Sequence, residues 1–357
     1  MKRILCLIEN LGSGGAERQL TGLAVMLKQN GYEVLVGYYV KKDFYLPYLK
    51  ENGVSALYFA DANSLHKRFF ALRKHIRDIN PDTIISYSAS PSIIACVLKR
   101  MGGLFHLVVS ERNTTQELTF REKMRFFCYR WADVIVPNSQ SQAYFIRNHY
   151  AKLSGKVKVI TNFVDTNKFL PAEPPQFEHE AIKIICVGRL MPQKNIHRFI
   201  KAVNIVRNDG YKIKVDWYGQ DLQDAYSKEC HDAISNYKLE NTFVFRAPST
   251  NIQDEYRNSD VFCLPSLFEG FPNVLCEAMS CGLPVICSRV CDNPDIIREG
   301  ENGLMFDPLK IEDMASVIEN YLNLSFNTKK KMGAKSREIA IHVFSQCIFI
   351  EKYISIV

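Results

Sequence analysis

Short apolar runs alternate with amphipathic stretches along nearly the whole chain. This alternation is typical of βαβ units, in which parallel strands form a sheet and the intervening helices cover its faces. The strand candidates are 3–8, 33–39, 56–59, 83–86, 106–109, 133–136, 157–160, 182–188, 213–218, 243–246, 261–264, 284–287 and 304–306. The helix candidates include 16–29, 64–78, 91–100, 194–208, 222–236, 272–281, 310–323, 328–342 and 345–355. We therefore predict an α/β fold with doubly wound parallel sheets.

One segment interrupts the alternation. Residues 171–180 (PAEPPQFEHE) hold three prolines and three glutamates, a composition typical of a linker. A chain of 357 residues is also long enough for two domains. We predict Rossmann-like domains over 1–170 and 182–340, a linker over 171–181, and a helix over 341–357 that crosses back to the first domain. Because ligands bind beyond the carboxyl ends of parallel strands, we expect the domains to face a central cleft.

Composition excludes several classes of protein. With 47% hydrophobic and 23% charged residues, the chain is neither disordered, nor collagen-like, nor a multi-span membrane protein. The first apolar run, Ile4 to Ile8, is shorter than the roughly 7–15 apolar residues of a secretion signal or the roughly 20 of a spanning helix. The 11 cysteines are odd in number and form no Cys-x-x-Cys pair. We expect buried, reduced thiols in a cytoplasmic protein.

Positive charge is concentrated in the first half. Residues 1–165 carry 23 Lys/Arg and 13 Asp/Glu, a net charge of +10, whereas residues 166–357 carry 22 and 25, a net charge of −3. The first half also contains two stretches that mix cations with aromatic residues, 66–74 and 120–131. They are either interfacial helices in peripheral contact with an anionic membrane, or ordinary amphipathic helices with an aromatic core side. We expect no nucleic-acid partner, because no binding module is recognisable.

A glycine-rich loop follows the first strand candidate. Gly12, Gly14 and Gly15 precede an amphipathic helix whose free N–H groups attract an anion. The loop is a dinucleotide fingerprint, another phosphate-binding loop, or a turn without a ligand. A dinucleotide site also needs an acidic residue about 20 positions on, at the end of the second strand. That strand ends in Tyr38-Tyr39-Val40, which argues against NAD or FAD.

The second half contains two glutamates in one short segment. Glu269 lies in a loop after strand 261–264, and Glu277 lies in a helix that Pro272 begins and Gly282 ends. A carboxylate accepts two hydrogen bonds from the vicinal diol of a ribose or a hexose. The alternative is that Glu277 lies on a solvated helix face and Glu269 is a loop charge.

Two cations follow the first strand of the second half. Strand 182–187 leads into Gly188-Arg189-Leu190-Met191-Pro192-Gln193-Lys194. A rigid guanidinium fork and a compact ammonium together suit a diphosphate, although exposed surface cations are the simpler alternative.

With these motifs, the chain resembles the retaining GT-B glycosyltransferases of family four. The strongest part of the resemblance is E-x7-E, here Glu269 to Glu277 within FEGFPNVLCEAMSCGLPVI. The Gly188-Arg189-Leu190…Lys194 motif and the GGAER loop are less specific. The resemblance covers essentially the whole chain and implies transfer of a sugar from a nucleotide diphosphate sugar, with retention of the anomeric configuration.

The resemblance also implies roles for individual residues. Arg189 and Lys194 would neutralise the departing diphosphate, and Glu277 would hold the ribose hydroxyls. Glu269 would hold the donor sugar. The remaining donor-binding candidates are Gly14, Gly15, Gly188, Gly270, Phe271, Asn273 and Val274. No Asp-x-Asp motif occurs, so we expect no metal and no cofactor.

The acceptor side departs from the family pattern. Many relatives carry a histidine after the strand equivalent to 106–109, where this chain has Ser110-Glu111-Arg112-Asn113. His106 begins that strand and is expected to be structural. Glu111, Arg112 and Glu17 are the candidate acceptor contacts. The SERN sequence is similar to loops in transferases of bacterial surface-polysaccharide assembly.

We therefore expect a metal-independent hexosyltransferase that uses a UDP-sugar, or next a GDP-sugar. Its acceptor would be a glycan, lipid-linked through a polyprenyl diphosphate, in lipopolysaccharide or capsule assembly at the inner face of the plasma membrane. The alternatives are a GT-B nucleotide-sugar epimerase, which would consume donor without an acceptor, and a non-catalytic nucleotide-sugar binding protein.

Overall fold

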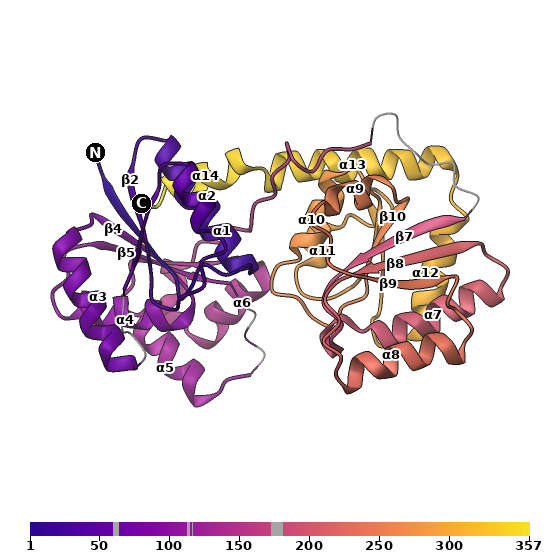
Figure 1. Ribbon diagram of the computed structural model, residues 1–357, viewed down its shortest axis with the longest axis horizontal. Coiled ribbons are helices and arrows are strands. Elements are labelled where there is room, and N and C mark those ends of the chain that lie inside the picture. Colours follow the sequence, from indigo (N-terminus) through magenta and orange to yellow (C-terminus); the bar gives the residue numbers. More distant parts are fainter. Residues whose placement is uncertain (60–63, 113–114, 116, 173–180) are drawn as a thin grey trace. The chain divides into compact units, whose positions relative to one another are not determined.

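The structure is a computed structural model that describes residues 1–59, 64–112, 115, 117–172 and 181–357 (Figure 1). The chain divides into two compact units, one of Met1–Phe163 with Cys347–Val357 and one of Val164–Gln346. Each unit is a six-stranded parallel sheet covered by helices. The predicted α/β class with two Rossmann-like domains is thus confirmed. Of the linker predicted over 171–181, residues 173–180 lie outside the described residues.

The first unit orders its strands β3-β2-β1-β4-β5-β6. Its strands are β1 (Arg3–Leu7), β2 (Glu33–Tyr38), β3 (Ser55–Tyr58), β4 (Thr83–Tyr87), β5 (His106–Glu111) and β6 (Val134–Pro137). Its helices are α1 (Gly15–Gln29), α2 (Leu46–Glu51), α3 (Leu65–Ile79), α4 (Ala89–Arg100), α5 (Phe120–Tyr129), α6 (Gln140–His149), η1 (Ala151–Lys156) and α14 (Gln346–Ile354).

The second unit repeats this topology with the order β12-β11-β10-β7-β8-β9. Its strands are β7 (Ile182–Val187), β8 (Ile213–Tyr218), β9 (Phe243–Arg246), β10 (Val261–Leu264), β11 (Val285–Ser288) and β12 (Gly303–Phe306). Its helices are η2 (Pro192–Lys194), α7 (Ile196–Asn208), α8 (Ala225–Asn236), α9 (Ile252–Arg257), α10 (Asn273–Ser280), α11 (Asn293–Ile296), α12 (Ile311–Leu322) and α13 (Phe326–Phe344).

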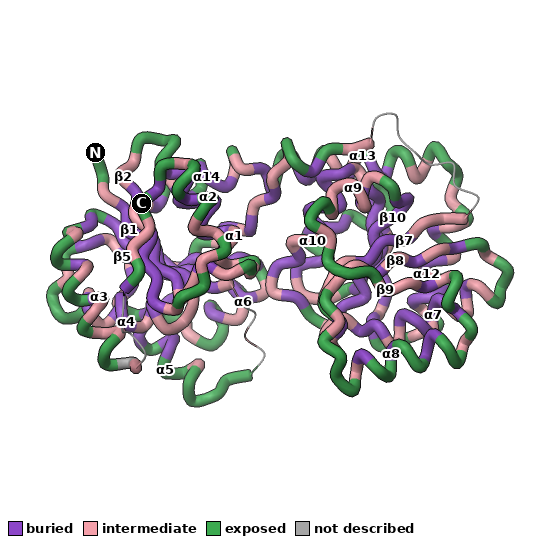
Figure 2. Tube along the Cα trace, viewed as in Figure 1, coloured by how far each residue is buried: buried purple, intermediate pink, exposed green. Residues whose placement is uncertain are grey.

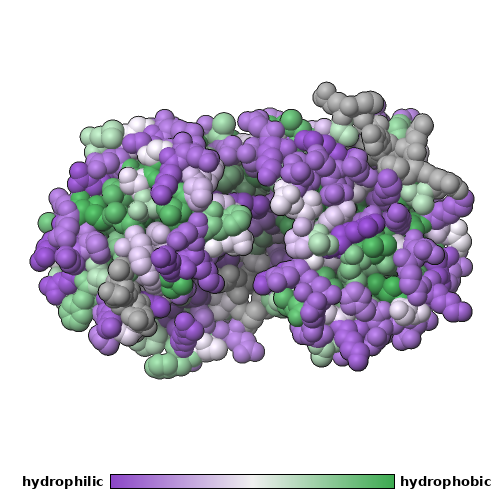
Figure 3. Space-filling view, viewed as in Figure 1, coloured by the Kyte–Doolittle hydropathy of each residue, from purple (hydrophilic) through white to green (hydrophobic). Residues whose placement is uncertain are grey.

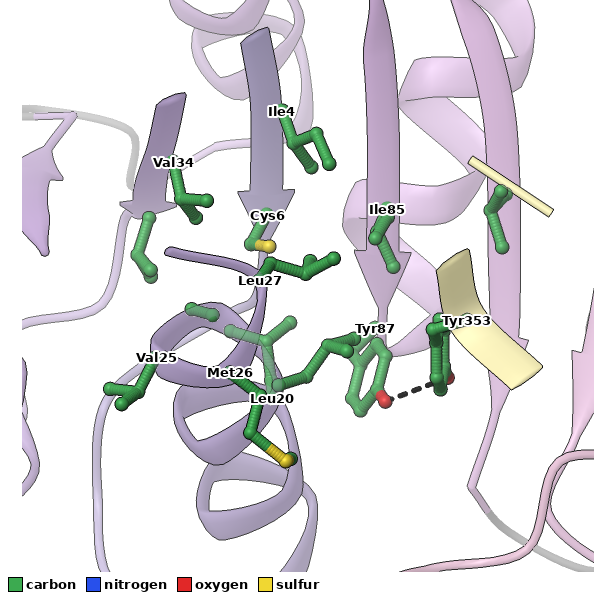
Figure 4. Packing of buried hydrophobic residues seen from close by; sticks show 14 of the residues in the cluster. Ile4, Cys6, Leu20, Val25, Met26, Leu27, Val34, Ile85, Tyr87 and Tyr353 are labelled. Atoms are coloured by element: carbon green, nitrogen blue, oxygen red, sulfur yellow. Dashed lines mark hydrogen bonds between the residues drawn. The ribbon is translucent and has the colours of Figure 1, made fainter. Parts of the chain in front are cut away.

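The strands are apolar on both faces because helices cover both faces of each sheet. In β1, Ile4 and Cys6 pack with α1 and α14, whereas Leu5 and Leu7 pack on the opposite face with α3, α4, α5 and α6. Figure 4 shows the first of these faces, where Cys6 and Ile85 lie over Leu20 and Leu27 of α1. Figure 2 shows the buried strands running through the middle of each unit, with exposed positions mostly on the outer helices and loops.

One predicted strand is absent. Residues 157–160 were expected to extend the first sheet, but the described chain forms only an isolated bridge between Val157 and Ile135. The amide of Ile160 still bonds to Pro137 O at 3.2 Å, so the apolar residues of this segment pack at the sheet edge without continuing the ladder.

The chain enters the second unit earlier than the predicted boundary at 170. Val164 pairs with Ser345, and Phe169 is buried in the core of the second unit. Arg337 of α13 donates hydrogen bonds to the carbonyl oxygens of Phe169 at 2.9 Å and Thr166 at 3.1 Å. These contacts fasten the start of the predicted linker to the second unit. The chain returns to the first unit at Cys347 rather than at residue 341, because α13 continues unbroken to Phe344.

Two features of the exterior bear on function. On the face seen in Figure 3, hydrophilic side chains form most of the surface, and hydrophobic side chains gather in smaller patches. No helix within the described residues is both long and apolar enough to cross a membrane.

Candidate functional site

In each sheet, two neighbouring strands have connections that leave in opposite directions. Open α/β sheets bind ligands at such a switch point, beyond the carboxyl ends of the strands. The switch points lie between β7 and β10 in the second unit and between β1 and β4 in the first. The candidate residues follow these strands, and each unit is described by itself.

The loop after β7 is anchored on both sides. The Gly188 amide donates to Tyr218 O at 2.9 Å, and the Gly188 carbonyl accepts a 2.7 Å bond from Trp217 Nε1. A side chain at position 188 would begin 3.0 Å from Cε of Lys194, so glycine leaves room for the lysine stem. The backbone of Asn195 is left-handed, with a φ of 58°, and its side-chain amide donates to Pro265 O and Pro308 O. The loop is therefore fixed before any ligand arrives.

The loops after β7 and β10 are also bonded directly to each other. The amide of Leu267 donates to Gln193 O at 2.8 Å, and Gln193 Nε2 donates to Phe268 O at 2.8 Å. These two bonds hold the segment that carries Lys194 beside the segment that carries Glu269.

Lys194 and Glu269 form an ion pair at this junction. The Nζ–Oε1 distance is 2.6 Å, and the side chains are 14% and 9% exposed. The Glu269 amide additionally contacts Sγ of Cys291 at 3.5 Å. An ion pair this sheltered loses part of its hydration, so removing one partner leaves the other charge poorly solvated. The predicted Lys194 and Glu269 are thus brought together, in a contact that the sequence alone did not indicate.

Arg189 differs from Lys194 in its surroundings. Its side chain is exposed and has no hydrogen-bond or ion-pair partner among the described residues. It is therefore a cation available to an anionic ligand at the carboxyl end of β7.

The start of α10 presents backbone donors. Pro272 lies just before the helix, one position earlier than predicted, and Gly282 ends it with a φ of 78°. The amides of Gly270 and Phe271 have no acceptor among the described residues. The Phe271 ring itself packs in the core against Phe344, with ring centroids 5.7 Å apart, so only its backbone is available to a ligand.

Glu277 is buried rather than on a wet helix face. It is 4% exposed, and its Oε2 lies 3.4 Å from the hydroxyl of Tyr256, which also reaches Val274 O at 3.3 Å. The alternative of a solvated glutamate is therefore wrong. Asn273 and Val274 form the first turn of α10, on the same helix as Glu277.

The glycine-rich loop of the first unit leads directly into α1 and lies close to the Glu17 side chain of that helix. Gly14 precedes α1 with an ordinary φ of −87°, so glycine is not needed for its dihedral angles. A Cβ at position 14 would instead lie 2.1 Å from a carboxylate oxygen of Glu17. Gly15 is the first residue of α1, and the Glu17 carboxylate stabilises the positive end of the helix.

A pocket of about 510 Å³ lies at the carboxyl ends of β1, β4 and β5. The loop after β1 contributes Glu9, the start of α4 contributes Ser88 and Ser90, and β5 contributes Glu111 and the following Arg112. Further arginines reach the pocket from the neighbouring helices: Arg68 from α3 and Arg121 and Arg125 from α5. The pocket therefore collects positive charge at the switch point of the first sheet.

Glu111 forms a buried part of the pocket wall. The Tyr129 hydroxyl donates to its carboxylate, and Arg125 Nη2 lies 3.2 Å away. Burial raises the pKa of Glu111 above its ordinary value despite these partners.

Arg112 joins three distant segments of the first unit. Its guanidinium donates to Asn162 Oδ1 at 2.6 Å and to the hydroxyls of Tyr87 and Tyr353. The two tyrosine hydroxyls are 2.9 Å apart, and the dashed line in Figure 4 marks the hydrogen bond between them. The predicted acceptor contact is thus also a structural connection to the C-terminal helix.

His106 lies at the opposite end of β5 from this pocket. Its Nε2 is 2.9 Å from Ile356 O, and its Nδ1 is 3.5 Å from Asp133. These contacts tie the start of β5 to the C-terminal segment, so His106 has the structural role that was expected.

Comparison with known families identifies the chain. The family model Glycosyltransferase Family 4 matches residues 13–168, and the model Glycosyl transferases group 1 matches residues 171–339. The chain belongs to the family 4 glycosyltransferases. The predicted membership in this family is therefore confirmed, whereas retention of configuration and the roles of the motif residues stay predictions.

This glycosyltransferase is similar to curated proteins of bacterial glycan synthesis. It is 27% identical over 311 residues to the amylovoran biosynthesis glycosyltransferase AmsD of Erwinia amylovora, with 84% of each chain covered. It is 28% identical over 356 residues to a Campylobacter jejuni enzyme, with 94% of each chain covered. That enzyme is named GalNAc-alpha-(1->4)-GalNAc-alpha-(1->3)-diNAcBac-PP-undecaprenol alpha-1,4-N-acetyl-D-galactosaminyltransferase.

Among solved structures, the transferase resembles Anabaena Alr3699/HepE in complex with UDP. The TM-score is 0.88 at 19% identity, with 99% of both chains covered. This likeness concerns the fold, which is GT-B.

The sequence motifs did not indicate some residues of the pocket in the first unit. Ser88 and Ser90 follow strand 83–86, so their position after a parallel strand was the available signal. Arg68 and Arg121 were noticed only as parts of basic-aromatic stretches. No pattern in the sequence indicated that Cys291 would contact the Glu269 amide.

Proposed function

We propose that this glycosyltransferase moves a sugar from UDP-sugar to a lipid-linked glycan acceptor, with retention of configuration and without a metal ion. The observation that carries the proposal is the Lys194–Glu269 pair of 2.6 Å, placed beyond β7 and β10 and beside the exposed Arg189. UDP is favoured because the similar Anabaena protein was solved with UDP. GDP remains the second candidate.

The cations act on the leaving group. As the bond between the anomeric carbon and the diphosphate breaks, negative charge develops on the phosphate oxygens. Lys194 and Arg189 stabilise that charge, and the free amides of Gly270 and Phe271 add fixed dipoles. A bound donor competes with Lys194 for Glu269, whose carboxylate then accepts hydroxyls of the sugar. Glu277 accepts the ribose hydroxyls in exchange for its contact with Tyr256.

Retention follows from attack on the face that the diphosphate leaves. The acceptor oxygen forms its bond to the anomeric carbon as the bond to UDP breaks, and the acceptor proton passes to the departing phosphate oxygen. In the first unit, Gly14 and Gly15 at the start of α1 stay candidate phosphate contacts. In this proposal protein cations take the place of a divalent ion.

The acceptor proposal rests on the first unit and on the relatives. The Campylobacter relative is named for an acceptor attached to undecaprenol through a diphosphate. The AmsD relative is named for the synthesis of a bacterial polysaccharide. We assign the acceptor to the pocket lined by Glu111 and Arg112, and we keep Glu17, which follows the pocket residue Ala16 in α1, as a further candidate contact. The process would be bacterial surface-polysaccharide assembly.

We propose that the enzyme works at the cytoplasmic face of the membrane as a peripheral protein. None of the 11 cysteines is in a disulfide, which suits a reducing compartment. Helices α3 and α5 both pack beside α4, on one face of the first sheet. They expose Phe70, Phe120, Met124 and Phe127, together with Lys67, Lys74 and Lys123. We call these seven residues the basic-apolar face.

Single and double variants of the Lys194–Glu269 pair distinguish a role in catalysis from a role in balancing charge. Lys194→Gln and Glu269→Gln should each lower turnover by about 10²-fold or more, on the scale of one lost transition-state contact. Each should also lower thermal stability, because the partner charge is left unpaired in a sheltered site. The double variant is neutral and should regain part of the stability while its turnover stays low. UDP release and product formation are measured together with melting temperature.

Arg189→Ala completes this experiment. The Arg189 side chain has no partner among the residues that the structure describes, so stability should not change while turnover falls. Lys228→Ala is the matched control, because Lys228 is an exposed cation of α8 in the same unit. Turnover that returns with stability in the double variant would assign the pair a structural role only. Donor consumption without any acceptor would instead favour the epimerase, and donor binding without turnover in the wild type would favour the sensor.

A further inference from the structure

We propose that the pocket at the carboxyl ends of β1, β4 and β5 binds a phosphate group that links the acceptor glycan to its lipid. The inference rests on the proposed function and specifies the chemistry of its acceptor. It assigns phosphate binding to Arg112, Arg121, Ser88 and Ser90, of which only Arg112 was singled out in the sequence.

The charge of the pocket is not balanced by its own residues. Four arginines and three glutamates line it, a net charge of +1. Arg125 pairs with Glu111 and Glu122, and Arg68 lies 3.9 Å from Glu9. Among the described residues, Arg121 has no carboxylate partner, and Arg112 makes no ion pair but interacts weakly with the buried Glu111. An anion with two or more acceptor oxygens would neutralise these arginines and bind both.

The groups that hold the Arg112 guanidinium in position are uncharged. Its hydrogen-bond partners are the Asn162 amide oxygen and the hydroxyls of Tyr87 and Tyr353, and its guanidinium lies 4.2 Å from the centre of the Tyr87 ring. These contacts fix the position of the guanidinium without neutralising it. The positive charge is thus oriented before a ligand binds, which lowers the cost of binding an anion.

Two serine hydroxyls add uncharged donors. Ser90 Oγ is buried and lies near the Tyr39 hydroxyl, yet neither group has a hydrogen-bond partner of good geometry within the described chain. Ser88 precedes α4 but makes none of the capping bonds that serine usually makes there. A buried hydroxyl without a partner costs free energy unless a ligand or water satisfies it.

The backbone at Ser88 is strained at the same place. Its φ of 74° and ψ of 151° lie in a region that is almost confined to glycine. The carbonyl is fixed by the Ser92 hydroxyl at 2.7 Å and the Ser92 amide at 3.3 Å. Strain of this kind is concentrated at ligand sites, and here it coincides with the pocket and with the switch point of the sheet.

The surroundings favour a phosphate that carries a lipid. Met124 lies three residues after Arg121 on α5 and is 46% exposed, and side chains three residues apart are neighbours on a helix surface. Exposed apolar surface therefore lies next to Arg121, which lines the pocket. A free sugar or a free phosphate would leave this apolar surface exposed to water, whereas a prenyl chain or the bilayer would cover it.

The test measures binding directly and does not depend on turnover. Farnesyl diphosphate is titrated calorimetrically into the full-length protein with saturating UDP, so that Lys194 and Arg189 are already occupied. We expect saturable binding that Arg121→Ala and Ser90→Ala each weaken at least fivefold. Within the described chain, Arg121 has no hydrogen-bond or ion-pair partner and Ser90 Oγ has no hydrogen bond of good geometry, so both variants should fold. Arg130→Ala is the matched control, because Arg130 is an exposed arginine at the end of the same helix that does not line the pocket.

Two further probes identify which part of the ligand is recognised. Farnesol has the same chain without the diphosphate and should bind at least tenfold more weakly than farnesyl diphosphate. Inorganic pyrophosphate should also bind, with the same dependence on Arg121, but less tightly. Equal binding of farnesol and farnesyl diphosphate, or equal losses in Arg121→Ala and Arg130→Ala, would overturn the phosphate site. UDP binding measured in the same protein shows whether the donor site of the proposed function is intact.

Discussion

The residues at the two switch points are held by bonds that only a folded chain can make. Gln193 and Asn195 fasten one loop to another that follows about seventy residues later in the chain. Ser88 is held in a conformation that its own side chain opposes. The loops of the second unit are thus fixed by hydrogen bonds to each other, whereas the loop at Ser88 holds a strained backbone conformation.

Ser88→Gly should stabilise the protein. Relief of strain of about 1–3 kcal/mol outweighs the added backbone entropy of glycine in the unfolded chain, about 0.5–1 kcal/mol. Thermal denaturation measures the gain. Ser88→Ala is the control, since alanine meets the same steric barrier and should leave the melting temperature nearly unchanged. A Ser88→Gly protein that melts below the wild type would show that the backbone at this position is not strained.

At the scale of elements, α3 and α5 each have one side in the core and one side exposed to solvent. Their inner aromatic residues, such as Phe126, are core residues, and their outer aromatic residues are exposed. The interpretation of these stretches as amphipathic helices with an aromatic core side is confirmed for the inner residues, whereas membrane contact of the outer residues stays a prediction. Three of the four arginines that line the pocket, Arg68, Arg121 and Arg125, also lie on these helices.

The basic-apolar face predicts how the protein binds vesicles. Cosedimentation should be stronger with anionic vesicles than with neutral ones. Lys74→Gln and Lys123→Gln should each weaken binding by about 1 kcal/mol, so the double variant should bind roughly tenfold or more weakly. Leu309→Ala is the control, because Leu309 is 65% exposed but belongs to the second unit. Equally negligible pelleting with both lipids would remove the membrane proposal and leave the transferase proposal intact.

At the scale of the whole molecule, the end of the chain belongs with its beginning. Residues Cys347–Val357 are part of the first unit, where Phe349 and Tyr353 lie in the same core as β1 and α1. The second unit is thus inserted, in sequence, into the first. A substitution in α14 should therefore lower the local stability of β1 and β4, although these strands lie about three hundred residues earlier in the chain.

Tyr353→Ala tests this connection. Loss of the buried ring should cost about 3–5 kcal/mol, and the Arg112 and Tyr87 partners lose a hydrogen bond as well. Hydrogen exchange should accelerate in β1, β4 and β5 and stay unchanged in β7 to β12. Glu351→Ala, at an exposed position of the same helix, should change neither. Faster exchange in the second unit instead would contradict the assignment of the C-terminal residues to the first.

The sequence by itself determined the α/β class, the two sheets and the family, because hydrophobic periodicity and short motifs are local and each strand buries both faces. It also indicated Lys194, Glu269 and Glu277 through their spacing. It could not determine that 157–160 leaves the sheet, that the chain changes units at Phe163, or that Arg112 binds the C-terminal helix. Those outcomes depend on contacts between residues far apart in sequence, which exist only once the sheets have formed. The tertiary structure alone placed four arginines, Ser88 and Ser90 around one pocket.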